Sequence, residues 1–338
     1  MKQILPRLLG LLGVAVLAAG LTVACSAPKK DNFSVKVEGG APNDDWPARP
    51  EVQGRVEAHF PVVQRQSVQV GGADALDVRL VERRDQPVVV LRWLIPGGRA
   101  AEWQSGAAAP VAKKSVKGQT VGGRWPEGTA QLTGDLLTMG TKHHPGQAYA
   151  AALGELGAHL DVQVLSDATV VSGRVMAHKV APFLALLHEM LTEPSLEASA
   201  LDNLKKRYRS ELHSEAGDAA AVAHRLGLRL AYGADHPYGS TGATLDSIDK
   251  IQLQHVRAAW QQLAQLGGST LVVVGDTDLA RLIPQLQGPF AAELALRRSF
   301  AAVALPQAIT GDTCWVTDLP EAQQTALVQV SASPSRRA

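Results

Sequence analysis

The order of strand-like and helix-like patterns along residues 76–290 most constrains what this chain can fold into. Leu76–Glu82 alternates between apolar and polar residues, and Val88–Ile95 is a nearly continuous apolar run typical of a buried strand. Turn-forming residues separate these two segments, so the pattern predicts a hairpin.

Helical and strand patterns then follow one another irregularly. Apolar residues at i, i+3, i+4, i+7 and i+11 from Val180 predict an amphipathic helix that ends near Pro194. The lack of regular strand–helix alternation favours an α+β fold, with an antiparallel or mixed sheet packed against helices. The other expected elements are helices at 127–139 and 146–156, paired strands at 160–164 and 168–175, a long helix or a broken pair at 201–232, a helix at 248–266 and a buried strand at 270–274.

The N-terminal segment is typical of an exported protein. Two basic residues precede the apolar run Leu8–Val23, and a small residue precedes Cys25. We expect residues 1–24 to be a cleaved signal peptide, with an uncleaved membrane anchor as the alternative. The stretch Thr22–Cys25 resembles a bacterial lipoprotein box, in which Cys25 would be lipidated. An ordinary signal peptide with an incidental cysteine stays open. The lipoprotein interpretation places the chain in the periplasm, anchored in the outer membrane.

Composition divides the rest of the chain. Residues 25–75 contain prolines and glycines without a helical period, so we expect a tether and an irregular lead-in. Residues 76–290 form the predicted α+β domain. The pattern weakens over 291–338, which we interpret as the start of a truncated second domain or as appended strands. Two segments in that region, 314–316 and 325–330, could be strands.

The overall charge argues against nucleic-acid binding. Lys and Arg total 33 and Asp and Glu total 32 among 338 residues, which gives a formal net charge of +1. Aromatic residues make up only 4%, too few for base stacking to be a main function. The two cysteines cannot form a disulfide framework or a Cys-rich zinc site.

The chain has 10 histidines, which are candidate metal ligands. Neither H-E-x-x-H nor H-x-x-E-H occurs, and the candidates left are the pair His143 and His144, the pair His188 and Glu189, and His236. His188 and Glu189 lie opposite the apolar stripe of their helix, so we expect them to be solvated. A functional zinc site needs at least three well-placed groups, and none of these candidates provides them by sequence alone.

No nucleophile motif is evident either. The segment Gly239–Gly242 has no flanking strand as a G-x-S-x-G motif requires, and Cys314 has no nearby histidine to activate its thiol. The motif search by itself therefore gives no active site.

Six segments in a fixed order carry a resemblance to a known family. They are the hairpin Leu76–Ile95 with Gly97-Gly98, Gly128–Thr141, Leu153–Ala158, Leu187–Pro194 with Leu204–Glu215, His236–Gly239 and Val273–Asp276. Together they resemble one half of a zinc peptidase of the pitrilysin/insulinase type, a group that includes the mitochondrial processing peptidase.

The resemblance also assigns the zinc-site positions. In active members the helix matched by Gly128–Thr141 carries H-x-x-E-H. The resemblance places Gln131 at the first His, Gly134 at the Glu and Asp135 at the second His. The third ligand is a Glu on a later helix, and only that one is retained, as Glu211. Glycine has no side chain to activate water, so neither catalysis nor bound zinc is expected here.

The resemblance further implies a partner. The active unit of this family has two halves that close over the substrate, and the halves can be separate chains of which only one carries zinc. The leading hypothesis is therefore a non-catalytic, lipid-anchored homologue that pairs with a zinc-bearing chain and helps to bind a peptide or unfolded polypeptide.

Two other hypotheses stay open. The first is an active zinc peptidase with an atypical ligand set, made of Glu211, Asp135 and one of His143, His144 or His188. The second is a peptide-binding or scaffold lipoprotein that kept the fold and changed its function.

Overall fold

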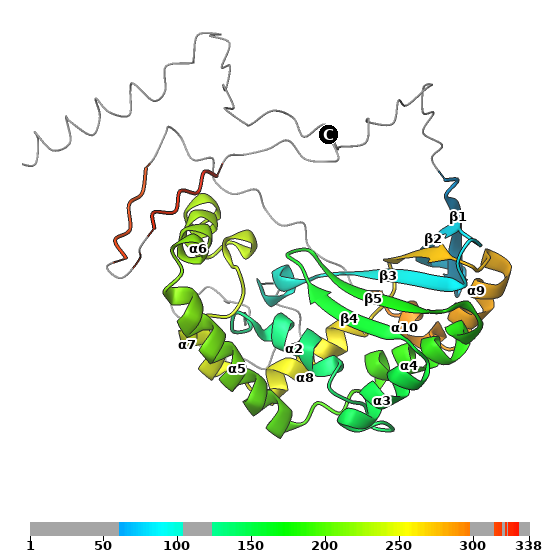
Figure 1. The fold of residues 1–338 in the computed structure, drawn as a ribbon. Coiled ribbons are helices and arrows are strands. Elements are labelled where there is room, and N and C mark those ends of the chain that lie inside the picture. Colours follow the sequence, from blue (N-terminus) through cyan, green and yellow to red (C-terminus); the bar gives the residue numbers. More distant parts are fainter. Residues whose placement is uncertain (1–60, 104–123, 298–313, 320–321, 323, 331–338) are drawn as a thin grey trace, which may run out of the picture. The chain divides into compact units, whose positions relative to one another are not determined.

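The computed structural model describes residues 61–103, 124–297, 314–319, 322 and 324–330. The predictions for the signal segment and for Cys25 lie outside these residues. Within them, one six-stranded mixed sheet is packed against helices, which confirms the predicted α+β class (Figure 1). No helix in the described part of the chain combines the length and the apolar character that crossing a membrane requires.

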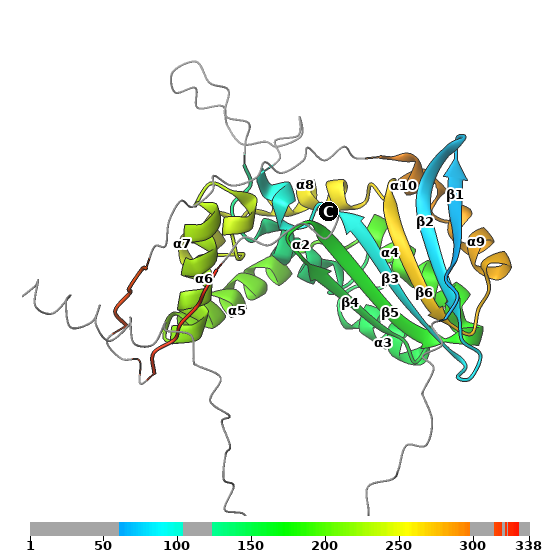
Figure 2. The ribbon, with the colours of Figure 1, turned by 90° about the horizontal axis from the view of Figure 1, so that it is seen from above.

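The strands lie in the order β1-β2-β6-β3-β5-β4, which Figure 2 shows from above. Only β2 and β6 run parallel, and every other neighbouring pair is antiparallel. The elements are β1 (Gln64–Val70), β2 (Ala73–Glu82), β3 (Val88–Pro96), η1 (Arg99–Trp103), α2 (Thr129–Leu137), α3 (Gln147–Glu155), β4 (His159–Val164), β5 (Ala168–Met176), η2 (Ala177–Lys179), α4 (Val180–Thr192), α5 (Ala198–Ala216), α6 (Ala219–Tyr232), η3 (Pro237–Gly239), α7 (Leu245–Lys250), α8 (Leu253–Leu263), β6 (Ser269–Gly275), α9 (Leu279–Gln287) and α10 (Ala291–Ala295).

The predicted hairpin between the second and third strands is wrong. Strand β6 lies between them, parallel to β2 and antiparallel to β3, and its Leu271 pairs with both Val78 and Trp93. The start of β3 is bonded to the end of β6 and not to β2, because the backbone N–H of Asp276, just after β6, donates to Val88 O. A strand as apolar as β6 buries most of its surface only with a neighbour on each side, and this central position provides both.

The lead-in predicted over residues 25–75 is not irregular throughout. Residues 64–70 form β1, which pairs antiparallel with β2 through a turn at Gly71 and Gly72. Both glycines have positive φ, as tight hairpin turns require. This strand was not predicted because Val68 is its only buried residue, so its sequence shows almost no alternation of apolar and polar residues.

Two helix predictions need correction or refinement. The helix expected at 248–266 is two helices, α7 and α8, because the backbone is extended at Ile251 and Gln252. The region 201–232 is the broken pair, with α6 starting where the Asp218 carboxylate accepts from the backbone of Ala220. Neither 314–316 nor the described residues 325–330 form a strand.

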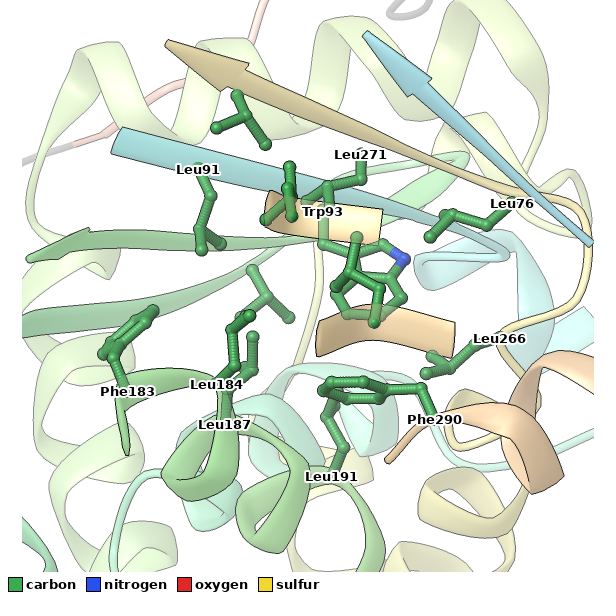
Figure 3. Close-up of a cluster of buried hydrophobic side chains, with 14 of the residues drawn as sticks. Leu76, Leu91, Trp93, Phe183, Leu184, Leu187, Leu191, Leu266, Leu271 and Phe290 are labelled. Carbon is green, nitrogen blue, oxygen red and sulfur yellow. The ribbon is translucent and has the colours of Figure 1, made fainter. Parts of the chain in front are cut away.

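The main core lies between the sheet and helices α4, α9 and α10 (Figure 3). Trp93 packs against Phe290 with ring centroids 4.9 Å apart, and its indole N–H donates to Ser269 Oγ at 2.7 Å. A second cluster joins α2, α5, α7 and α8 around Leu132, Leu204 and Ile248. Trp260 packs against both clusters, and its indole N–H donates to Leu191 O at 2.7 Å.

The other face of the sheet is left open by the described helices. In Figure 1, α3, α4, α9 and α10 lie along one face only. On β3, Val89 and Leu91 point into the core, whereas Val90 and Leu94 are 40% and 38% exposed. We call the side of the sheet that carries Val90 and Leu94 the open face.

Candidate functional site

Helix α2 carries three of the positions that the family resemblance assigns to zinc binding. Its N-terminus is capped by a buried glutamate, Glu102. Gly128 precedes α2 in a left-handed conformation and offers no side-chain cap. Glu102 supplies the cap from η1, because its carboxylate accepts from Ala130 N at 2.8 Å and from Gly128 N at 3.4 Å. Glu102 is 1% exposed, and this burial raises its pKa to about 8, although the two backbone bonds act in the opposite direction.

Gln131 and Gly134 are held closely by their surroundings. The Gln131 side-chain oxygen is buried, has no hydrogen-bond partner and faces Gly242, where a Cβ would lie 2.1 Å from it. A Cβ at Gly134 would lie 2.9 Å from Val164 Cγ2 and 3.3 Å from Val162 Cγ1. Helix α2 therefore approaches β4 more closely than a larger residue at position 134 would allow.

Asp135 and Glu211 are joined by an arginine. Arg207, on α5, donates from Nη2 to Asp135 Oδ2 at 2.7 Å and lies 3.4 Å from Glu211 Oε1 through Nε. The Tyr208 hydroxyl donates to the same Asp135 oxygen at 3.0 Å. Burial raises the pKa of Tyr208, and the Asp135 carboxylate raises it further, so the phenol keeps its proton.

These four family-equivalent positions do not fit zinc. Two imidazoles are replaced by an amide and a carboxylate, and the general-base position has no side chain. The two carboxylates share the Arg207 guanidinium, which offsets part of their charge, so a divalent cation would have to displace it. A zinc site needs at least three nitrogen, sulfur or oxygen ligands in tetrahedral geometry, and these four positions offer only two carboxylates that already hold a guanidinium.

The histidines proposed as alternative ligands contact glutamates instead. His144 Nδ1 lies 3.0 Å from Glu189, and the Thr141 hydroxyl also donates to Glu189. Burial raises the pKa of Glu189, but the bonds from Thr141 and His144 outweigh it and lower the pKa. His143 pairs separately with Glu193 at 3.1 Å. Both contacts fix the α2–α3 loop against the end of α4.

The expectation that His188 and Glu189 are solvated is wrong, because both are partly buried. His188 Nε2 lies 3.4 Å from Glu293, and its ring meets Phe290 edge-on at 4.9 Å. Helix α10, from the far end of the domain, covers this side of α4. No group of three or more His, Cys, Asp or Glu suited to a metal ion occurs among the residues that the structure describes.

The remaining candidates have structural roles or none. His236 accepts from Tyr238 N through Nδ1 at 3.1 Å and stacks on Tyr232. Ser240 is buried and accepts from Gly242 N, so its hydroxyl holds a turn. Cys314 is exposed as a free thiol.

Sequence reasoning missed Arg207, Tyr208 and Glu102. Arg207 precedes Glu211 by four residues on a predicted helix, a spacing at which opposite charges pair, so one of its two contacts had a local signal. Its contact with Asp135 joins α5 to α2 and is visible only in three dimensions. Glu102 had no signal, because a cap supplied by a distant element leaves no local pattern.

Comparison with known proteins finds a family match over part of the chain. Residues 124–232 match the family model described as Insulinase (Peptidase family M16). No protein of curated function matches the chain.

Several solved structures share the fold. The peptidase M16 inactive domain from Pseudomonas fluorescens has a TM-score of 0.60 and 23% identity, with 72% of this chain and 54% of that one covered. The first half of the periplasmic protease PqqL from Escherichia coli has a TM-score of 0.50 and 17% identity, covering 69% and 47%. The ferredoxin protease FusC, solved in complex with Arabidopsis ferredoxin, has a TM-score of 0.54 and 16% identity, covering 73% and 26%. This chain spans about half the length of the first two structures, and less of the third.

Proposed function

We propose that this chain, whose residues 124–232 match the Insulinase (Peptidase family M16) model, is a non-catalytic peptidase-like protein that pairs with a zinc-bearing homologue and helps it to hold a peptide or unfolded polypeptide. The observation that carries this proposal is the Arg207 guanidinium between Asp135 and Glu211. It occupies the two carboxylates at the positions that the family resemblance assigns to zinc ligands. Gly134 leaves no group there to take a proton from water.

Two features support pairing and peptide binding. The open face carries half-exposed apolar side chains such as Val90 and Leu94, which a second protein or a peptide would cover. Two of the solved structures are about twice as long as the part that this chain matches, and a third, about four times as long, was solved with a protein bound to it. A complete two-half unit would therefore need a second half from another chain or from further sequence.

We also propose that the protein acts in the bacterial envelope. The N-terminal segment up to Cys25 supports export and a lipid anchor at the outer membrane, facing the periplasm. The periplasmic origin of one solved relative agrees with that location. Radiolabelled palmitate incorporated into the wild-type chain but not into Cys25→Ser would establish the anchor, and equal labelling of both would contradict it.

Zinc content and peptide cleavage test the non-catalytic proposal. The full chain, purified without chelator and equilibrated with zinc, is expected to hold far less than one zinc per mole and to leave an unstructured peptide intact. Asp135→Asn and Glu211→Gln should leave both results unchanged. Stoichiometric zinc with cleavage that is lost in Glu211→Ala would overturn the proposal and favour the atypical ligand set.

Pairing is tested with a zinc-bearing M16 homologue from the same organism. We expect a 1:1 complex by size-exclusion chromatography with light scattering, and faster peptide cleavage by the homologue when this chain is present. Peptide binding by this chain with no complex and no acceleration would favour a peptide-binding or scaffold lipoprotein instead.

A further inference from the structure

A basic hollow lies on the open face where β3, β5 and β4 run side by side. The hollow has a volume of about 450 Å³. Its lining consists of two arginines, a histidine and small or apolar residues: Val90, Arg92, His159, Ser172, Gly173 and Arg174.

The strand register explains why these side chains gather. Arg174 on β5 is the partner of both Val90 on β3 and His159 on β4. In the next row Arg92 on β3 is the partner of Ser172 on β5. Side chains alternate between the two faces of a strand, so Arg92 and Arg174 both leave the sheet on the open face and lie diagonally across the β3–β5 pair.

The two arginines have no protein partner among the described residues. Neither forms an ion pair or a hydrogen bond there, whereas Arg79 on the same face pairs with Asp77 at 2.8 Å. Asp161 on β4 is the partner of Ser172 and is the carboxylate placed nearest by register, yet it pairs with neither arginine. The hollow therefore carries two uncompensated guanidinium charges beside an imidazole.

The surroundings indicate what these charges would bind. Each guanidinium presents several N–H donors in a planar fork that matches a carboxylate. Val90 and Leu94 beside them are half exposed, and β6 adds Val272 and Val274 in the same rows. A ligand that carries carboxylates on a partly apolar chain would satisfy both kinds of surface, which a free inorganic anion would not.

We infer that this hollow binds the Asp or Glu side chains of an unstructured acidic polypeptide through Arg92 and Arg174. The inference rests on the proposed peptide-holding function and adds a charge preference to it.

Two matched peptides test the preference. Both carry a fluorophore and the same unstructured sequence, but one has Asp and Glu where the other has Asn and Gln. Binding is followed by fluorescence anisotropy with the full chain, with Arg92→Gln/Arg174→Gln and with Arg257→Gln/Arg281→Gln. The last variant removes the same charge from exposed positions on α8 and α9. Thermal unfolding of each variant checks that the sheet is intact.

We expect the wild-type chain and the α8–α9 control to bind the acidic peptide about tenfold more tightly than the amide peptide, because two partly exposed ion pairs together contribute on that scale. The Arg92/Arg174 variant should bind both peptides equally weakly. Rising salt should weaken binding of the acidic peptide alone.

Other outcomes separate the inference from the proposed function. Equal binding of both peptides by the wild-type chain would overturn the charge preference and leave peptide holding in place. No binding of either peptide would overturn both. Equal loss of acidic-peptide binding in the two double variants would overturn the assignment to Arg92 and Arg174. Displacement of the acidic peptide by millimolar phosphate would identify a simple anion site. Self-association that the Arg92/Arg174 variant loses would identify a second copy of the chain as the occupant.

Discussion

Two ionisable side chains, the fully buried Glu102 and the half-exposed Arg207, contact helix α2 from other elements. Glu102 caps its first turn from outside, and Arg207 holds Asp135 on its exposed side. The Arg207 contact occupies Asp135, where a metal site would need an open ligand. The Glu102 contact makes stability depend on pH.

Glu102→Gln should flatten the dependence of stability on pH. The Glu102 pKa is about 8 in the folded chain, above its ordinary value of 4.5, so the folded state binds the extra proton between these values. The stabilisation is complete below about pH 4.5 and is lost as the pH rises to about 8, a change on the order of 5 kcal/mol. Urea unfolding at pH 5, 6.5 and 8 measures it.

The comparison between the two proteins isolates this carboxyl from all other titrating groups. Wild type should lose stability relative to Glu102→Gln across that range. Glu127 and Arg99, which also act on Glu102, stay the same in both proteins. Parallel stability profiles would show that Glu102 is ionised throughout.

At the scale of elements, the close approach of α2 to β4 depends on a missing side chain. Alanine is the better helix former by about 1 kcal/mol, so Gly134→Ala would stabilise an isolated helix. In the folded chain the new Cβ would meet two valines on β4, and valine cannot easily move its branched side chain.

Gly134→Ala should therefore destabilise the domain by about 1–3 kcal/mol. Gly154→Ala on α3 is the matched control, because a Cβ there has nothing within 4 Å, and it should stabilise by up to about 1 kcal/mol. If this interpretation is right, denaturant unfolding will show that the free energy of unfolding falls in Gly134→Ala and rises in Gly154→Ala. Stabilisation by both would show that β4 yields to the added methyl group.

Elements differ in how well the sequence predicted them, for physical reasons. Helix α4 and the β4–β5 pair were predicted because their burial follows a local period. Strand β1 was not, because only Val68 in it is buried. The insertion of β6 between β2 and β3 could not be predicted either, since strand order depends on partners far away in the chain.

The candidate site was likewise predictable only in part. The family resemblance assigned Gln131, Gly134 and Asp135 to one helix, and all three lie on α2. It could not show that Arg207 reaches Asp135 from α5 or that β4 lies against Gly134, because both contacts join separate elements.

At the scale of the whole molecule, Trp260 connects the two hydrophobic clusters. It packs against the sheet cluster and the helical cluster, and its bond to Leu191 O ties α8 to the end of α4. Because Trp260 contacts both clusters, its removal should weaken the packing between them.

Trp260→Ala should cost about 3–5 kcal/mol and separate the stabilities of the two clusters. Hydrogen exchange should then show a larger loss of protection in α5 and α7 than in β3 and β5. Trp260→Phe keeps most of the packing and loses the hydrogen bond, so it should cost only about 1–2 kcal/mol. An equal loss of protection in all four elements would contradict this role.

The central place of β6 has a consequence for how the chain is made. It is the last of the described strands to leave the ribosome, yet it fills the gap between two strands near the start of the domain. Until then β2 and β3 each expose an unpaired edge, a template for wrong pairing and aggregation. Contacts between residues so distant in sequence also slow folding. A growing chain of this protein therefore depends on protection, by a chaperone or by delayed folding, until Ser269–Gly275 has emerged.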